Sequence, residues 1–186
     1  MIYSALLLAA AGTEEMEAII AADVLVRAGF RVDIAGLESG IVKGSRGISF
    51  VIDHSLSEVK DAGHDVLVLP GGLGGVENLI SLPGIDSLLE DFSSSKRLIA
   101  AICAAPLILH RRGYLNKLPE FTSHPSVRGQ FGDISERWVD KRTVYKNGIL
   151  TSQGPGTAFE FAFEIIRIIC GDKKVSEINS GILARV

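Results

Sequence analysis

The sequence is poor in the residues that mark several protein classes. It holds only two cysteines, Cys103 and Cys170, among 186 residues, and no CxxC motif or His/Cys cluster. Neither a disulfide framework nor a zinc-binding motif is therefore indicated. Basic and acidic residues nearly balance, 19 against 22, for a formal net charge of −3. Since nucleic-acid binding needs clustered Lys and Arg, we expect no specific nucleic-acid partner.

Long apolar runs and basic leader segments are also missing. A membrane-spanning helix needs roughly 20 unbroken apolar residues, whereas the clearest uncharged run near the start extends only from Ala5 to Ala11. No Lys or Arg precedes that run, so it lacks the pattern of a secretory signal peptide. A hydrophobic share of 47% excludes disorder. These features predict one globular domain over residues 1–186, with a cytoplasmic location and no membrane partner.

Glycine is the one residue type in excess. The 20 glycines make up about 11% of the chain, compared with a usual share of roughly 7%. They gather at 71–75 and at 154–156, each time after an apolar run that resembles a strand. Glycines clustered at the end of a strand indicate a backbone that turns sharply or approaches another group closely.

Apolar strands alternate with amphipathic helices along the chain. We expect strands at 2–10, 31–37, 65–69, 98–102 and 149–152, and helices at 13–29, 73–96 with a break near 83–84, 104–112, 155–170 and from 172. Thr13 would cap the first helix and Gly29 would close it. Residues 38–54 predict a hairpin beside the main sheet, and the Asn147-Gly148 turn predicts another. This alternation predicts a flavodoxin-like three-layer α/β sandwich with a mostly parallel sheet covered by helices on both faces.

The strand at 98–102 leads directly into Cys103, and a helix follows at once. This order is typical of a nucleophile elbow, in which a sharp strand-to-helix turn exposes a reactive side chain above the sheet. The start of a helix favours a thiolate and so predicts a lowered thiol pKa. A buried structural cysteine is the alternative interpretation. We expect that structural role for Cys170, which lies on the apolar stripe of a late helix.

The glycine cluster after the strand at 65–69 does not match a phosphate-binding loop. It lacks the GxxxxGK[ST] pattern, and Glu77 stands where the last glycine of GxGxxG belongs. We interpret the cluster as backbone packed beside a neighbouring site, with N–H groups that can donate to an oxyanion. A tight turn without a function is the alternative.

Glu17 lies one turn into the first helix, which begins at the end of the first strand. Adjacent central strands would bring Glu17 to the same edge of the sheet as the cysteine, and ligands bind at that edge in such folds. Taken alone, Glu17 is more simply explained as a surface residue. Glu14 and Glu15 are expected to be solvated residues that favour the positive end of the helix.

Of the four histidines, His124 has the most suggestive position. It lies in an irregular segment beyond a strand end, where loops often carry function. A neutral surface histidine is the simpler alternative. His54 and His64 lie in polar connectors and should be solvated, and His110 lies two helical turns beyond the cysteine, too far for direct contact.

Five segments of the chain form a specific combination of motifs: Gly12–Glu17, Leu69–Gly72, Ala100–Pro106, Ser123–Pro125 and Gly154–Ala162. Together they resemble the ThiJ/PfpI superfamily, in the branch of Parkinson disease protein seven, which contains protein deglycases and redox sensors. The resemblance extends from about Ile2 to Gly171. It implies a flavodoxin-like homodimer with a reactive cysteine on a strained elbow.

The resemblance also implies roles for individual residues. Cys103 would be the reactive thiol, with Glu17 as a protonated acid hydrogen-bonded to it. His124 would be the nearby histidine of the site. The backbone N–H groups of Gly72 and Ala104 would stabilise an oxyanion.

The same resemblance implies which residues lie at the rim of the site. Arg27 and Arg46 would lie near the dimer interface and the mouth of the site, and Gly154 and Pro155 would belong to its rim. Four residues depart from the pattern that the resemblance implies. Leu73, Ala105 and Gln153 stand where Asn, Gly and Arg respectively are expected, and Val51 stands where one branch of the family has Cys. These departures leave Cys103, Glu17 and His124 in place, and they bear on substrate preference, rim charge and interface thiol chemistry.

Residues and resemblance together predict a cysteine-dependent glyoxalase or protein deglycase that responds to oxidative stress through oxidation of Cys103. The Cys103 thiolate would attack an aldehyde of methylglyoxal or glyoxal, and proton transfer through Glu17, with help from His124, would yield the 2-hydroxy acid. The same chemistry on early protein adducts would be deglycation, and neither route needs a metal or an organic cofactor. The alternatives are a non-catalytic redox sensor or chaperone and, with a Cys–His dyad, a cysteine peptidase.

Overall fold

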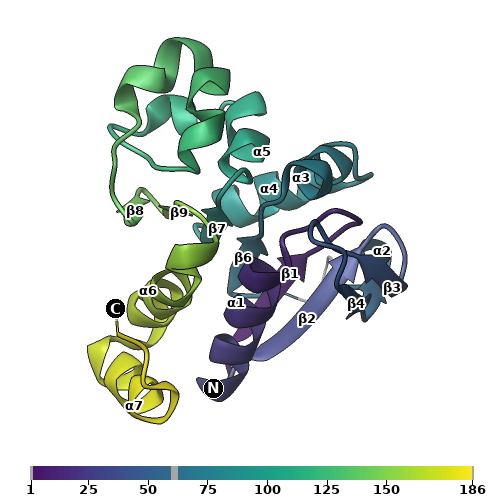
Figure 1. The fold of residues 1–186 in the computed structure, drawn as a ribbon, viewed down its shortest axis with the longest axis vertical. Coiled ribbons are helices and arrows are strands. Elements are labelled where there is room, and N and C mark those ends of the chain that lie inside the picture. The colour runs from purple at the N-terminus through teal and green to yellow at the C-terminus, as the bar shows by residue number, and fades with distance from the viewer. Residues whose placement is uncertain (1, 60–62, 186) are drawn as a thin grey trace.

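A seven-stranded sheet forms the centre of the computed structural model, which describes residues 2–59 and 63–185 (Figure 1). The strands are β1 (Ser4–Leu8), β2 (Arg31–Gly36), β5 (His54–Ser55), β6 (Val66–Leu69), β7 (Leu98–Ile102), β8 (Thr143–Lys146) and β9 (Ile149–Ser152). Their order is β5-β2-β1-β6-β7-β9-β8, and all neighbours are parallel except the β8–β9 hairpin. Numbered along the chain, the five long parallel strands have the order 2-1-3-4-5, which is that of flavodoxin-like folds.

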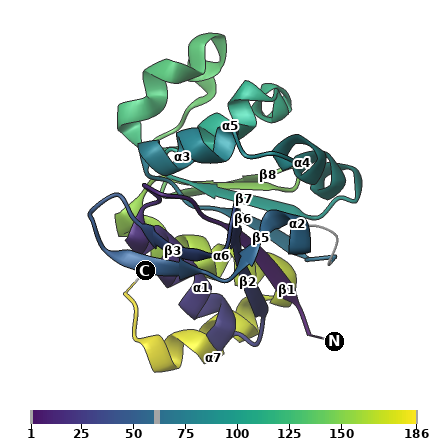
Figure 2. The same cartoon turned by 90° about the vertical axis from the view of Figure 1, so that its right-hand side faces the viewer.

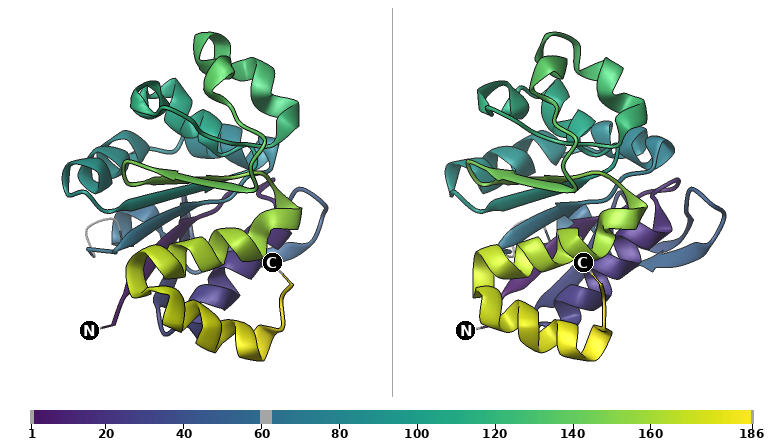
Figure 3. Two further views of the ribbon diagram at one scale, coloured as in Figure 1. Left: turned by 90° about the vertical axis from the view of Figure 1, so that its left-hand side faces the viewer. Right: turned by 60° about the vertical axis from the view of Figure 1, so that its left-hand side comes forward.

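Helices cover both faces of this sheet (Figure 2). One face carries α3 (Leu73–Ile80), α4 (Ile85–Ser94), α5 (Pro106–Arg111) and the 3-10 segments η1 (Tyr114–Lys117) and η2 (Pro125–Arg137). The other face carries α1 (Glu15–Arg27), α6 (Ala158–Cys170), which follows η3 (Pro155–Thr157), and α7 (Asp172–Ile182). Figure 3 shows α6 and α7, yellow-green and yellow, packed together below the sheet. The expected three-layer α/β sandwich is therefore confirmed.

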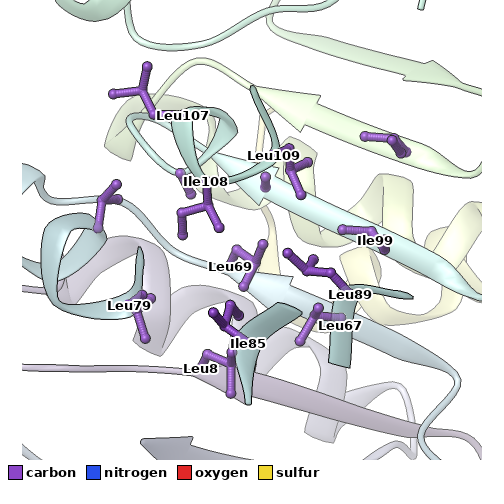
Figure 4. Close-up of a cluster of buried hydrophobic side chains, with 14 of the residues drawn as sticks. Leu8, Leu67, Leu69, Leu79, Ile85, Leu89, Ile99, Leu107, Ile108 and Leu109 are labelled. Carbon is purple, nitrogen blue, oxygen red and sulfur yellow. The ribbon is translucent and has the colours of Figure 1, made fainter. Parts of the chain in front are cut away.

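The three central strands β1, β6 and β7 are buried along their whole length. Burial on both faces explains their unbroken apolar sequences. In β1, Leu6 and Leu8 pack against the α3–α5 layer, whereas Ala5 and Leu7 pack against the α1–α6 layer. Figure 4 shows part of the first core, with strand residues meeting helix residues: Leu8, Leu67, Leu69, Leu79, Ile85, Leu89, Leu107, Ile108 and Leu109. No helix within residues 2–59 and 63–185 is long and apolar enough to cross a bilayer.

The hairpin expected beside the main sheet is also confirmed. It consists of β3 (Gly40–Lys43) and β4 (Ser49–Ile52), paired antiparallel as a separate sheet. Its turn is fixed to the loop before α1, because the Ser45 N–H donates to the Thr13 carbonyl at 2.9 Å and the Gly12 N–H donates to the Lys43 carbonyl at 2.8 Å. These bonds hold the hairpin turn over the start of α1.

Two local expectations, for Thr13 and His64, are wrong. The sequence also does not indicate one short strand and the short helix that follows it. Thr13 does not cap α1, because its hydroxyl oxygen accepts from the Ala10 N–H at 3.0 Å and Glu14 occupies the N-cap position. His64 is 1% exposed rather than solvated, with its Nε2 2.6 Å from Asp33 Oδ2. That partner lies 31 residues away, outside any local pattern. The two-residue β5 and the four-residue α2 (Leu56–Val59) are too short for periodicity to reveal.

Candidate active site

Cys103 turns the chain sharply from the end of β7 into α5. Its φ is +64°, a left-handed conformation that is strained for a residue other than glycine. The Cys103 N–H donates to the Ser152 carbonyl at 2.9 Å, and its carbonyl accepts from the His124 N–H at 2.8 Å. The strained residue is thus held by backbone hydrogen bonds from both sides, in the strand–turn–helix geometry of an elbow.

Glu17 is fully buried beside this elbow. Its Oε2 accepts from the Gly71 N–H at 2.7 Å, and within the described part of the chain Oε1 has no well-formed hydrogen bond. Gly71 lies between the two side chains, because a Cβ built on it would be 2.6 Å from Cys103 Cβ and 2.8 Å from Glu17 Oε2. The simpler interpretation of Glu17 as a surface residue is therefore wrong.

Burial changes the acidity of both groups. It raises the pKa of the Glu17 carboxyl to about 7, although the Gly71 N–H and the neighbouring Cys103 thiol lower it in part. Burial and the Glu17 carboxylate raise the pKa of the Cys103 thiol to about 12, against the lowering effect of the Gly72 and Ala104 N–H groups. The low thiol pKa expected from the helix start is therefore wrong, because burial first, and then the negative charge of Glu17, outweigh the N–H groups.

The N–H groups of Gly72 and Ala104 face the sulfur of Cys103 and lower the pKa of its thiol. In the described residues neither N–H donates to an oxygen. Gly72 has a φ of +82°, and a Cβ there would lie 2.3 Å from the Gly12 carbonyl oxygen, so a side chain does not fit. The glycine cluster brings backbone close to the cysteine, as its sequence indicates.

His124 lines a cavity that opens over Cys103, but within the described chain its ring makes no hydrogen bond to the sulfur. The Ser126 N–H donates to His124 Nδ1 at 3.2 Å, and Ser126 Oγ lies 2.7 Å from the same nitrogen. Because Nδ1 accepts, the neutral ring carries its proton on Nε2. A Cβ on Gly154 would be 3.1 Å from His124 Cδ2, so this glycine lies against the ring.

A cavity of about 500 Å³ opens over Cys103. Arg46 lines it with a side chain that is 78% exposed, and its Nε lies 3.6 Å from Glu14 Oε2. Arg27 does not reach the cavity, because it lies in the last turn of α1 and pairs with Asp23 at 2.6 Å. The sequence-predicted residues that line the cavity are Arg46, Gly72, Cys103, Ala104, His124 and Pro155.

Glu14 and Glu15 are buried, not solvated as expected. Glu15 Oε1 accepts from the Arg46 N–H at 2.8 Å and from the Ile48 N–H at 3.1 Å, and the Ser45 hydroxyl donates to Glu14 Oε2 at 2.6 Å. Burial raises the pKa of Glu15, but its hydrogen bonds outweigh burial and hold that pKa below its usual value. Glu14 also lines the cavity over Cys103. The sequence does not reveal the burial of either carboxylate, because their partners lie in the distant hairpin turn.

Comparison with known proteins identifies the family. The DJ-1/PfpI family model matches residues 3–168. The chain belongs to the DJ-1/PfpI family. Protein dj-1beta of Drosophila melanogaster is 46% identical over 185 residues, 98% of each chain. Glutathione-independent glyoxalase DJR-1.2 of Caenorhabditis elegans is 36% identical, over 89% of this chain and 87% of that protein. The crystal structure of Drosophila melanogaster DJ-1beta superposes with a TM-score of 0.92 at 43% identity, covering 100% of both chains.

Membership of the DJ-1/PfpI family confirms the resemblance seen in the sequence motifs. The superposition over the whole chain confirms the flavodoxin-like fold as well. The residues that the family model matches, 3–168, include Glu17, Cys103 and His124 of the site.

Proposed function

We propose that the protein is a cysteine-dependent glyoxalase and deglycase that acts on methylglyoxal, glyoxal or their early protein adducts. The observation that carries this proposal is the enclosed Glu17–Cys103 pair, an acid with a pKa of about 7 beside a thiol on an elbow. An acid of that pKa both takes up and releases protons near neutral pH, as general acid–base catalysis requires. The glyoxalase name of the C. elegans relative supports the same activity.

The proposed reaction begins with a covalent bond to sulfur. The Cys103 thiol gives its proton to Glu17 as the sulfur attacks the aldehyde carbon of methylglyoxal. The resulting oxyanion accepts from the N–H groups of Gly72 and Ala104. Glu17 then protonates that oxygen, which gives a neutral hemithioacetal and returns the carboxylate.

Proton transfer between the two carbons completes the conversion. Glu17 removes the proton of the sulfur-bearing carbon and delivers it to the neighbouring carbonyl carbon, while the hydroxyl proton moves to the other oxygen with help from His124. The sulfur-bearing carbon becomes a thioester, and water hydrolyses it to lactate and free thiol. One carbon is oxidised and its neighbour reduced, so methylglyoxal and water balance lactate without an external oxidant.

The same arrangement supports a response to oxidative stress. Peroxide would oxidise the sulfur of Cys103, as its proton passes to Glu17, first to a sulfenic acid and then to a sulfinate. The sulfinate oxygens would accept from the Gly72 and Ala104 N–H groups and from a protonated Glu17. A peptidase dyad is less well supported, because His124 Nδ1 accepts from Ser126 rather than from the thiol.

We also infer a homodimer. Large apolar side chains that are 45–64% exposed lie on α1 and the β3–β4 hairpin, and they are Met16, Ile19, Ile48 and Val51. Exposed apolar groups of this kind favour cover by a partner. Light scattering should report a mass near twice the 19.9 kDa of the chain. A monomer at micromolar concentration would remove Arg27 and Arg46 from any shared site.

The decisive experiment measures lactate production from methylglyoxal by the wild type, Cys103→Ser and Cys170→Ser side by side. Cys170 is a matched control, because it is the other free cysteine and lies on α6, outside the cavity. The wild type and Cys170→Ser should produce lactate, and Cys103→Ser should not. A wild type that makes no lactate but accumulates Cys103 sulfinate would favour the redox sensor. Cleavage of denatured casein would favour the peptidase.

A further inference from the structure

The cavity over Cys103 has two chemically different walls. Polar and charged side chains come from the start of α1 and the hairpin turn, and they are Glu14, Ser45 and Arg46. The opposite wall, from α3 and η2, carries the apolar side chains Leu73 and Val127, here called the apolar wall, beside the polar His124 and Ser126. Figure 2 shows α3 and α5 on one side of the sheet, with α1 and β3 on the other. A ligand above the sulfur therefore meets a polar wall on one side and, on the other, a wall whose exposed apolar side chain is Leu73.

Leu73 is the accessible part of the apolar wall. Its side chain is 52% exposed, whereas Val127 is only 1% exposed and belongs to the core. Leu73 is the first residue of α3 and directly follows Gly72, whose N–H faces the sulfur. A ligand group that accepts from the Gly72 N–H and extends away from the sulfur therefore lies beside the exposed side chain of the next residue, Leu73.

We propose that Leu73 makes the site selective for 2-oxoaldehydes with an apolar substituent, an inference that rests on the proposed glyoxalase function. With the aldehyde oxygen at the Gly72 and Ala104 N–H groups, the second carbonyl oxygen faces the polar wall, where the Arg46 guanidinium is a donor. The substituent then lies against Leu73. Contact removes apolar surface of both groups from water, and this favours binding in proportion to the area covered.

The substrate order follows from the size of the substituent. Glyoxal carries only hydrogen there, methylglyoxal carries a methyl group and phenylglyoxal carries a phenyl ring. The value of kcat/KM should therefore rise from glyoxal to methylglyoxal to phenylglyoxal. Loss of one or two methylene-sized contacts in an apolar pocket changes kcat/KM by roughly 10-fold or more.

The test compares kcat/KM for phenylglyoxal and glyoxal in the wild type, Leu73→Asn and Leu37→Asn. Leu37 is a matched control, because it is 63% exposed and lines a separate cleft. The phenylglyoxal-to-glyoxal ratio should fall about 10-fold in Leu73→Asn and keep its wild-type value in Leu37→Asn. Circular dichroism spectra equal to the wild type would show that both variants are folded.

The outcomes separate this inference from the proposed function. Turnover of both substrates with an unchanged ratio in Leu73→Asn would overturn the role of Leu73 and leave the glyoxalase function in place. Absence of turnover in the wild type would overturn the function, and protection of Cys103 from iodoacetamide would then test the apolar wall. Mandelate should protect the wild-type cysteine better than glycolate, and Leu73→Asn should lose this difference. Equal protection by both acids in the wild type would overturn the inference.

Discussion

Gly71→Ala should destabilise the fold and disturb the Glu17–Cys103 pair, whereas Gly74→Ala should not. A Cβ at residue 71 would lie 2.6 Å from Cys103 Cβ, 2.8 Å from Glu17 Oε2 and 2.9 Å from the Ala104 nitrogen. Optimal contacts between carbon atoms are roughly 3.5–4.0 Å, so the neighbours would have to move by about 1 Å. Gly71 is not among the residues with a positive φ, so the penalty comes from the contacts alone.

The expected magnitude follows from overpacking of a rigid site. Such changes cost about 1–3 kcal/mol, and with a urea m-value of roughly 2 kcal/mol/M the midpoint should fall by about 0.5–1.5 M. At Gly74 a Cβ would meet only Gly12 Cα, at 3.8 Å. Because Gly74 lies in α3, alanine should add up to about 1 kcal/mol through its higher helix propensity.

Urea unfolding at pH 7, followed by far-ultraviolet circular dichroism, measures both variants. The rate of Cys103 alkylation by iodoacetamide gives a second readout of the site itself. A wild-type midpoint and a wild-type alkylation rate in Gly71→Ala would refute the packing of Glu17 and Cys103 on either side of residue 71. An equal loss of stability in Gly74→Ala would show instead that the whole glycine cluster rejects side chains.

Three further predictions test the chemistry of the pair. Glu17→Gln keeps a donor but cannot shuttle a proton, so methylglyoxal turnover should fall by roughly 100-fold or more with the fold intact; wild-type turnover would contradict the role of Glu17. Because the folded pKa of Glu17 is raised from 4.5 to about 7, its contribution to stability is full below pH 4.5 and is lost as pH rises through 7. Urea unfolding at pH 5 and pH 8 should show a loss of up to about 3 kcal/mol in the wild type that Glu17→Gln lacks. Under mild peroxide, mass spectrometry should find about 32 Da added to Cys103, and less of this product in Glu17→Leu; equal yields would mean that Glu17 does not stabilise the sulfinate.

The order of strands and helices and the elbow itself were predictable from the sequence. The unbroken apolar runs of β1, β6 and β7 indicate burial on both faces, and the Asn147-Gly148 turn fixes the β8–β9 hairpin. Cys103 lies directly between a strand and a helix, so the residues next to it in the sequence are enough to predict its sharp turn. Features of this kind are local, because each is encoded within one or two turns of chain.

Sequence and resemblance already pair Glu17 with the thiol, but only the tertiary structure decided how each acidic residue is buried and how the pair titrates. Glu14, Glu15 and Glu17 share one short acidic stretch, yet the hairpin turn about 30 residues away binds the first two. Gly71, 54 residues away, donates to Glu17 and lies between it and Cys103. These long-range contacts set the burial of each group, and burial raises the pKa of the acid and of the thiol. A helix start predicts a more acidic thiol, but only the fold shows that desolvation and an adjacent carboxylate oppose it.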